Sequence, residues 1–369
     1  MTRRNRTPGE GTRVVHAGLP GPEAGTPFLP GPVFAAPYHL PGDPHAAPYG
    51  YGRFGNPTWS AYEAAIGELE GGEALVFASG MAACTAVLSR LRPGDLLVAS
   101  ADGYPTVRAV ATEYLAPRGV RTRFVPTGEI AEAVGGAALV WVETPANPAL
   151  GVCDIAEVAR AADAPVVVDN TLATPLGQRP LELGAAISVM SASKALTGHS
   201  DLVLGVVTCA DPADAAELRA WRERSGAIAG PFETWLAHRS LGTLELRLER
   251  QCQTALALAE MLARRDDVPD VRYPGLASAP GAEIAARQMR RFGPVVSFDL
   301  ETRERAERFL GALELVREAT SFGGLHSTAE RRARWDQGDD VSEGFIRLSC
   351  GCEDTADVLA DVAAALALA

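Results

Sequence analysis

Lysine is almost absent from this chain of 369 residues, whereas arginine is common. Of the 34 Lys and Arg residues, 33 are arginine, and the only lysine is Lys194. Arginine can replace lysine wherever a solvated positive charge suffices, but its guanidinium stays protonated and cannot form an imine with an aldehyde. Lys194 is therefore expected to perform chemistry that arginine cannot. The alternative is a biased composition in which one lysine survives by chance.

The sequence also lacks long apolar runs and an excess of positive charge. No window reaches the roughly 18 uninterrupted apolar residues that a membrane span needs, and no apolar segment of an export signal follows the arginines within residues 1–7. The net charge is −12, so clustered cations that would bind nucleic acid or an anionic membrane are not expected. These absences predict a cytoplasmic protein with neither nucleic-acid nor membrane partners.

Cysteine is scarce and scattered, with six residues in the chain. Most of them lie in apolar runs, which predicts reduced core residues rather than disulfides. Cys350 and Cys352 resemble half of a metal motif, but no second Cys or His pair at ligand spacing accompanies them. We therefore predict no metal site and expect these two cysteines to lie on one face of a strand.

The order of predicted elements indicates an α/β fold with two domains. Gly-Pro turns over residues 1–46 predict an extended N-terminal arm. Alternating strand-like and helical runs over 47–240 then predict a large domain with a doubly wound, mostly parallel seven-stranded sheet buried on both faces. Its strands are expected at 74–78, 96–99, 121–125, 138–143, 165–169, 187–191 and 203–208.

The remaining residues, 241–369, predict a smaller C-terminal α+β domain. A helical pattern from Phe232 to Arg264 is long enough to bridge the two domains. Strands are expected at 294–299 and 345–349, and helices at 303–314 and 354–367.

Polar residues follow several predicted strands, at the edge of the sheet where ligands of open α/β folds bind. Asp169 ends the run PVVVD and is followed by Asn170 and Thr171. A carboxylate at this edge can keep a pyridine nitrogen protonated, so that the ring accepts the electron pair left when a substrate Cα loses its proton. The alternative interpretation is a capping or turn aspartate.

Two further segments offer hydrogen-bond donors to a phosphate. Ser191 and Ser193 precede Lys194 at a spacing that lets both hydroxyls bind one anion. The sequence Ser79-Gly80-Met81 ends another strand and opens a helix, whose first N–H groups and dipole favour an anion. A lysine beside two phosphate-binding segments indicates pyridoxal 5′-phosphate (PLP), which is held on lysine as a Schiff base.

These residues are part of a longer resemblance that spans nearly the whole chain. Eight ordered motifs resemble the cystathionine γ-synthase/γ-lyase (Cys/Met metabolism) family of fold-type I PLP-dependent enzymes. The motifs are YGYGRFGNPTW at 49–59, SGMAA at 79–83, Tyr104, ETPANP at 143–148, VVVDNT at 166–171, SASK at 191–194 with GHSD at 198–201, SFGG at 321–324 and IRLSCGCED at 346–354.

The resemblance implies roles in cofactor binding and catalysis. Lys194 would bind PLP and carry protons, Asp169 would pair with the pyridinium nitrogen, and Tyr104 would stack on the ring and protonate the leaving group. Thr171 would be a further cofactor contact. The phosphate would be held by Gly80, Met81, Ser191 and Ser193, together with Tyr51 and Arg53 of a neighbouring subunit.

The resemblance also implies a substrate site and an assembly. Asn147, Ser321 and Arg347 would bind the substrate carboxylate, with Arg347 providing a bidentate fork. The alternative for Arg347 is a surface or inter-domain ion pair. Because Tyr51 and Arg53 would act across a subunit boundary, we expect a homo-oligomer with shared active sites, and a tetramer in particular.

The departures from the family pattern concern the substrate. Thr320 stands where enzymes handling cystathionine often have glutamate, and the loop after Tyr104 is shorter by one residue. An arginine-rich segment at 331–334 replaces the usual stretch, and His326 before it is either a substrate contact or an ordinary loop histidine.

We therefore predict a PLP-dependent γ-elimination lyase acting on an L-amino acid. A γ-replacement synthase, a β-eliminating enzyme and a PLP-binding protein without turnover are the alternatives.

Overall fold

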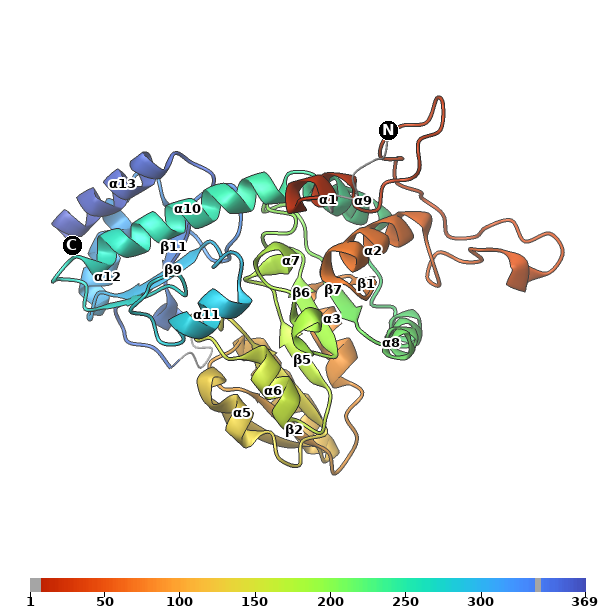
Figure 1. Ribbon diagram of the computed structural model, residues 1–369, viewed down its shortest axis with the longest axis horizontal. Helices are drawn as coiled ribbons and strands as arrows, with labels where there is room; N and C mark the ends of the chain where they lie inside the picture. Colours follow the sequence, from red (N-terminus) through yellow and green to blue (C-terminus); the bar gives the residue numbers. More distant parts are fainter. Residues whose placement is uncertain (1–7, 336–339) are drawn as a thin grey trace, which may run out of the picture.

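The computed structural model describes residues 8–335 and 340–369, and its larger part is built on a seven-stranded sheet (Figure 1). The strand order is β1-β7-β6-β5-β4-β2-β3. Strands β3, β2, β4, β5 and β6 are parallel, whereas β7 is antiparallel to both of its neighbours. The predicted mostly parallel sheet is confirmed. Its strands are β1 (Glu73–Phe77), β2 (Leu96–Ser100), β3 (Arg121–Val125), β4 (Leu139–Glu143), β5 (Val166–Asp169), β6 (Ile187–Ser191) and β7 (Gly205–Cys209).

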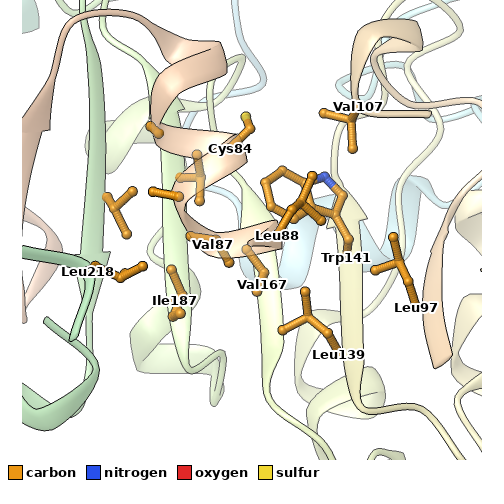
Figure 2. Close-up of a cluster of buried hydrophobic side chains, with 14 of the residues drawn as sticks. Cys84, Val87, Leu88, Leu97, Val107, Leu139, Trp141, Val167, Ile187 and Leu218 are labelled. Carbon is orange, nitrogen blue, oxygen red and sulfur yellow. The ribbon is translucent and has the colours of Figure 1, made fainter. Parts of the chain in front are cut away.

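Alternate residues of the central strands enter separate cores on the two faces of the sheet. Figure 2 shows one core, in which Val87 and Leu88 of α3 pack near Trp141 and Val167. Val140, the neighbour of Trp141, points into the opposite core. This two-residue alternation explains why the strands are apolar at nearly every position.

Helices connect these strands and cover both faces. Within the larger part they are α1 (Glu10–His16), α2 (Pro57–Glu70), α3 (Gly80–Leu88), α4 (Pro105–Ala109), α5 (Ile130–Ala133), α6 (Ile155–Ala161), α7 (Thr174–Gly177), α8 (Pro212–Ser225) and α9 (Pro231–Leu241). Helix α4 continues directly into a π-helical stretch, Val110–Leu115.

A second, five-stranded sheet forms the C-terminal part of the molecule, in the order β10-β11-β12-β9-β8. Residues of α10, α12 and α13 pack on this sheet in one apolar core, which confirms the smaller α+β unit. The strands are β8 (Asp270–Arg272), β9 (Val295–Asp299), β10 (Arg317–Glu318), β11 (Thr328–Arg331) and β12 (Phe345–Ser349). The helices are α10 (Leu244–Ala263), α11 (Ala282–Gln288), α12 (Arg303–Ala312) and α13 (Thr355–Leu368).

The predicted single helix over 232–264 is wrong, because the chain breaks between α9 and α10 at Gly242 and Thr243. Glycine is a poor helix former, and the break exposes backbone groups that need other partners. Arg247 provides one of them, since its Nη2 donates to the Ser240 carbonyl at 2.9 Å.

The strand placement of Cys350 and Cys352 is also wrong. Strand β12 ends at Ser349; the Cys350 N–H still bonds the Pro294 carbonyl next to β9, whereas the Cys352 N–H bonds the Leu325 carbonyl instead. The six cysteines are all free thiols. Among the described residues, no group of three or more His, Cys, Asp or Glu side chains is arranged to hold a metal ion.

The segment between α1 and α2 extends away from the body of the molecule (Figure 1). It carries exposed apolar side chains, including Phe28 and Phe34, and contacts itself through a bridge between Pro37 and Tyr51. The domain boundaries at residues 46 and 240 stay predictions. Within the described part of the chain, no helix is long and apolar enough to cross a membrane.

Candidate active site

A cavity of about 570 Å³ lies where the carboxyl ends of several sheet strands meet the C-terminal part. Strands β4, β5 and β6 are parallel, so the residues that end them reach the same edge. Strand β1 ends at this edge too, and α3 begins there. The predicted site residues that line the cavity are Gly80, Met81, Tyr104, Asn147, Asp169, Thr171, Ser191, Ser193, Lys194, Ser321 and Arg347.

Lys194 projects from the loop after β6 and meets a residue of the C-terminal part. Its Nζ donates to Ser321 Oγ at 2.7 Å and lies 5.4 Å from the centre of the Phe322 ring. Burial lowers the pKa of the Lys194 amine, and the neighbouring Arg347 charge lowers it further. A lower pKa increases the fraction of neutral amine, which is the form that attacks a carbonyl.

Asp169 ends β5 and is held by the residue two positions later. The backbone N–H and the hydroxyl of Thr171 both donate to Asp169 Oδ1, at 3.0 and 2.5 Å. Thr171 Oγ1 in turn accepts from the Ser191 N–H at 2.8 Å. Burial raises the pKa of Asp169, so a cation placed against this carboxylate would be needed to favour its charged form.

Glu143 is a second carboxylate in the cavity, and sequence analysis did not single it out. It ends β4, directly opposite Asp169 in the strand register. It accepts the backbone N–H groups of Tyr104, at 2.5 Å, and Asn147, at 2.9 Å. Burial, and then the nearby Asp169 charge, raise its pKa well above the usual value. The signal that could have identified Glu143 is its place at a strand end in the motif ETPANP.

The start of α3 presents backbone donors to the cavity. Ser79 caps this helix, because its hydroxyl accepts from Ala82 N at 3.0 Å, whereas the first N–H groups of a helix have no partner within the helix. The backbone is closely approached here, since a Cβ on Gly80 would lie 2.8 Å from Ser191 Cβ. The Ser193 hydroxyl also lines the cavity, although it already donates to Leu204 O and accepts from Leu204 N.

Arg347 gathers the other polar residues at the C-terminal side of the cavity. Its Nη1 donates to Asn147 Oδ1 at 2.6 Å, and its Nη2 donates to the Ser321 carbonyl at 3.3 Å. Nη2 also bonds the carboxylate of Glu330, which lies opposite Arg347 in the pairing of β11 with β12. Sequence analysis missed Glu330, because only the register of two strands brings it beside Arg347.

The arginine-rich segment turns one side chain toward the cavity and two away from it. Arg332 lines the cavity together with Thr320 and Trp335. Arg331 instead pairs with Glu343, and Arg334 pairs with Glu318. His326 is exposed and is not among the residues that line the cavity.

Tyr51 and Arg53 do not line the cavity of their own chain. Arg53 Nη1 donates to the Glu223 carbonyl at 2.5 Å, and its guanidinium lies 4.7 Å from the centre of the Phe54 ring. A direct role of Tyr51 and Arg53 in an active site therefore depends on a second subunit.

The donor set of the cavity fits PLP. The N–H groups at Gly80 and Met81 suit a phosphate, the buried Asp169 carboxylate suits a pyridinium, and the Lys194 amine suits an aldehyde. Fold and cavity together define a class, the fold-type I PLP-dependent enzymes.

Comparison with known proteins identifies the family within this class. The chain matches the model of the Cys/Met metabolism PLP-dependent enzymes over residues 33–367, and it belongs to that family. A Streptomyces coelicolor protein provisionally named cystathionine gamma-lyase is 57% identical, with 97% of this chain and 94% of that protein covered.

Two solved structures show how closely the fold agrees. The metB protein of Corynebacterium glutamicum has a TM-score of 0.94 at 36% identity, covering 98% of each chain. The cystathionine gamma synthase of Xanthomonas oryzae pv. oryzae, solved in complex with aminoacrylate and cysteine, has a TM-score of 0.93 at 33% identity, covering 98% of each chain. The protein is a PLP-dependent enzyme of this family.

Proposed function

We propose that this enzyme is a γ-elimination lyase, which removes the γ-substituent of an L-amino acid and releases a 2-oxo acid and ammonia. The observation that carries the proposal is the meeting of Lys194, Asp169 and Arg347 in one cavity, with Tyr104 also in its wall. The relative at 57% identity bears a lyase name, which favours elimination.

Each side chain has a task that follows from its position. Arg347 and Asn147, joined by a 2.6 Å hydrogen bond, are suited to bind the α-carboxylate through charge-assisted hydrogen bonds. Bound PLP supplies the electron sink that makes the Cα proton acidic, and Asp169 keeps its nitrogen protonated. Lys194, with its lowered pKa, removes the proton at Cα and then one at Cβ.

Tyr104 is suited to protonate the leaving group. Its backbone is fixed by the hydrogen bond to Glu143, and its side chain is 39% exposed. A partly exposed phenol in the cavity wall can donate to a leaving group that departs toward solvent.

A γ-replacement synthase is the alternative, since a nucleophile can capture the same substrate after the leaving group has departed. The similarity to a cystathionine gamma synthase supports this alternative. We also propose a homo-oligomer with shared sites, and a cytoplasmic location because six free thiols suit a reducing compartment.

Product analysis separates the two reactions. The loaded enzyme is incubated with γ-substituted amino acids, with and without an added thiol, and 2-oxo acid, ammonia and retained amino acids are measured. We expect 2-oxo acid and ammonia in equal amounts without thiol. A product that retains its amino group and appears only with thiol would contradict the lyase proposal and support the synthase.

Thr320, Arg332 and Trp335 form one wall of the cavity, here called the distal wall, and this wall gives an expectation for cystathionine. Its remote ammonium would meet Thr320 and the guanidinium of Arg332, and a charge-assisted hydrogen bond to a carboxylate, worth about 1.5 to 3 kcal/mol, is not provided by threonine. We expect a kcat/KM for cystathionine roughly tenfold or more below that for O-acyl-homoserines or γ-halogenated amino acids. The reverse order in a steady-state comparison would contradict this reading of the distal wall.

A further inference from the structure

Glu330 is a buried carboxylate that contacts the cavity wall from behind. It lies on β11, is 1% exposed, and is not itself among the cavity-lining residues. Its Oε1 accepts from Arg347, from Arg332 at 2.9 Å and from Thr320 at 3.2 Å. Its Oε2 accepts from the Trp335 indole at 2.7 Å. All four donors line the cavity, so one carboxylate contacts both the carboxylate-binding arginine and the distal wall.

The negative charge of this carboxylate favours the arrangement of the two arginines. Arg347 and Arg332 are both buried and both bond the same oxygen. Two guanidinium groups this close repel each other, and burial reduces the screening of that repulsion by solvent. Neutralising Glu330 removes the carboxylate oxygen that both guanidinium groups bond, so their mutual repulsion is offset less.

The backbone adds a second constraint on Arg347. Glu330 and Arg347 are direct cross-strand partners, so their side chains leave the sheet side by side on one face. The guanidinium is then held between Glu330 on one strand and Asn147 from the loop after β4.

We propose that Glu330 is a positioning residue for substrate recognition. It holds Arg347 in the orientation that binds the α-carboxylate, and it couples this clamp to the distal wall formed by Thr320, Arg332 and Trp335. The inference rests on the proposed function only in that Arg347 receives the α-carboxylate.

Binding of unreactive ligands tests the inference without turnover. L-norvaline has no γ-leaving group, and 1-butylamine is the same molecule without its carboxylate. Dissociation constants for both are measured in the PLP-loaded protein from the absorbance change of the bound cofactor. We expect Glu330→Gln to narrow the preference for norvaline over butylamine by roughly tenfold to hundredfold. For reactive substrates, the same variant should raise KM more than it lowers kcat.

A second carboxylate–arginine pair provides a control. Glu343 pairs with Arg331, but neither residue lines the cavity, so Glu343→Gln removes one negative charge from an arginine pair without touching the clamp. The preference of the Glu343→Gln variant for norvaline over butylamine should equal that of wild type. A general loss of structure would weaken both ligands and leave the ratio unchanged.

Two outcomes overturn the inference. One is an unchanged ratio of the butylamine and norvaline dissociation constants in folded Glu330→Gln. The other is an equal decrease of this ratio in Glu343→Gln. If Glu330→Gln does not fold, Glu330→Asp is used, because aspartate retains the charge on a shorter side chain. It should decrease the ratio of the two dissociation constants to a smaller extent. An unchanged ratio in Glu330→Asp also overturns the inference. Failure of the proposed elimination is a separate result, seen when wild type releases no 2-oxo acid although norvaline still binds.

Discussion

At the scale of single residues, both the residue type of Lys194 and its surroundings suit it to act as a nucleophile and base. Burial of its amine and the nearby Arg347 charge both lower its pKa. A lysine in such surroundings is a better nucleophile and base at neutral pH than an exposed one. Arginine at the same position would keep the positive charge, but because it stays protonated it could not form an imine with an aldehyde.

We therefore expect Lys194→Arg to abolish turnover while the protein stays folded. Rates should fall by at least about a thousandfold, as they do when a covalent catalytic group is removed. Release of 2-oxo acid measures the activity, and a circular dichroism melt measures the fold. Since Lys194 is the only lysine, borohydride treatment of loaded wild type should fix the cofactor to the peptide containing it. Retained turnover in the folded variant would contradict the central assignment.

Sequence reasoning found the residues whose chemistry is local and missed those that depend on tertiary pairing. Lys194 and Asp169 could be selected because each follows a recognisable strand and carries a distinctive group. Glu330 and Arg332 could not, because one is defined by a register between β11 and β12 and the other by the direction in which a short segment turns. Arg347 could be identified only through the resemblance.

At the scale of elements, apolar strands were predicted to within about two residues, whereas the long helix was not. A strand buried on both faces is a short apolar run with clear ends, and the run VVVD at β5 is an example. The break between α9 and α10 depends on Gly242 and on side-chain capping by Arg247. Helical periodicity continues through such a break, so the pattern alone does not reveal it.

The end of helix α2 carries a carboxylate that makes stability depend on pH. Glu70 is fully buried, and burial raises its pKa to about 7. Its Oε1 receives a long hydrogen bond of 3.4 Å from Asn170, and Oε2 has no hydrogen-bond partner among the described residues. Because the folded state binds this proton more tightly than the unfolded chain does, its contribution is complete below about pH 4.5 and is lost as the pH rises through about 7.

Glu70→Gln should therefore stabilise the protein at alkaline pH. The neutral amide imitates the protonated acid, so we expect the variant to unfold with a free energy about 2 to 3 kcal/mol above wild type at pH 8.5, and with little difference at pH 5. Urea unfolding at both pH values measures this. Glu68→Gln, on an exposed position of the same helix, should change the free energy of unfolding by less than about 0.5 kcal/mol. A difference for Glu70→Gln that grows toward acid pH would contradict the assignment.

At the scale of the whole molecule, the N-terminal arm supports the proposed homo-oligomer. The part of this arm after α1 projects from the body (Figure 1) and exposes Phe28, Phe34 and Leu40. Exposed apolar side chains gathered on one segment are typical of a surface that a partner covers. Tyr51 and Arg53 follow this arm and lie outside the cavity of their own chain, and contact with a neighbouring cavity would give both a function.

Subunit mixing tests whether Arg53 acts on the neighbouring site. Lys194→Ala and Arg53→Ala protomers should each be inactive or severely impaired as homo-oligomers, the first because the amine is lost and the second because a phosphate contact is lost. In a mixed pair, one of the two sites takes an intact Lys194 from one chain and an intact Arg53 from the other. Random pairing of equal amounts should restore about a quarter of wild-type sites.

The matched control mixes Lys194→Ala with Asp169→Ala protomers. The intact Lys194 and the intact Asp169 line the same cavity of one chain and can never be combined across chains, so no activity should return. Differently tagged subunits followed by native mass spectrometry establish that exchange has taken place. If exchange is complete and the Lys194→Ala and Arg53→Ala mixture stays inactive, each site is built from one chain and the arm has another role.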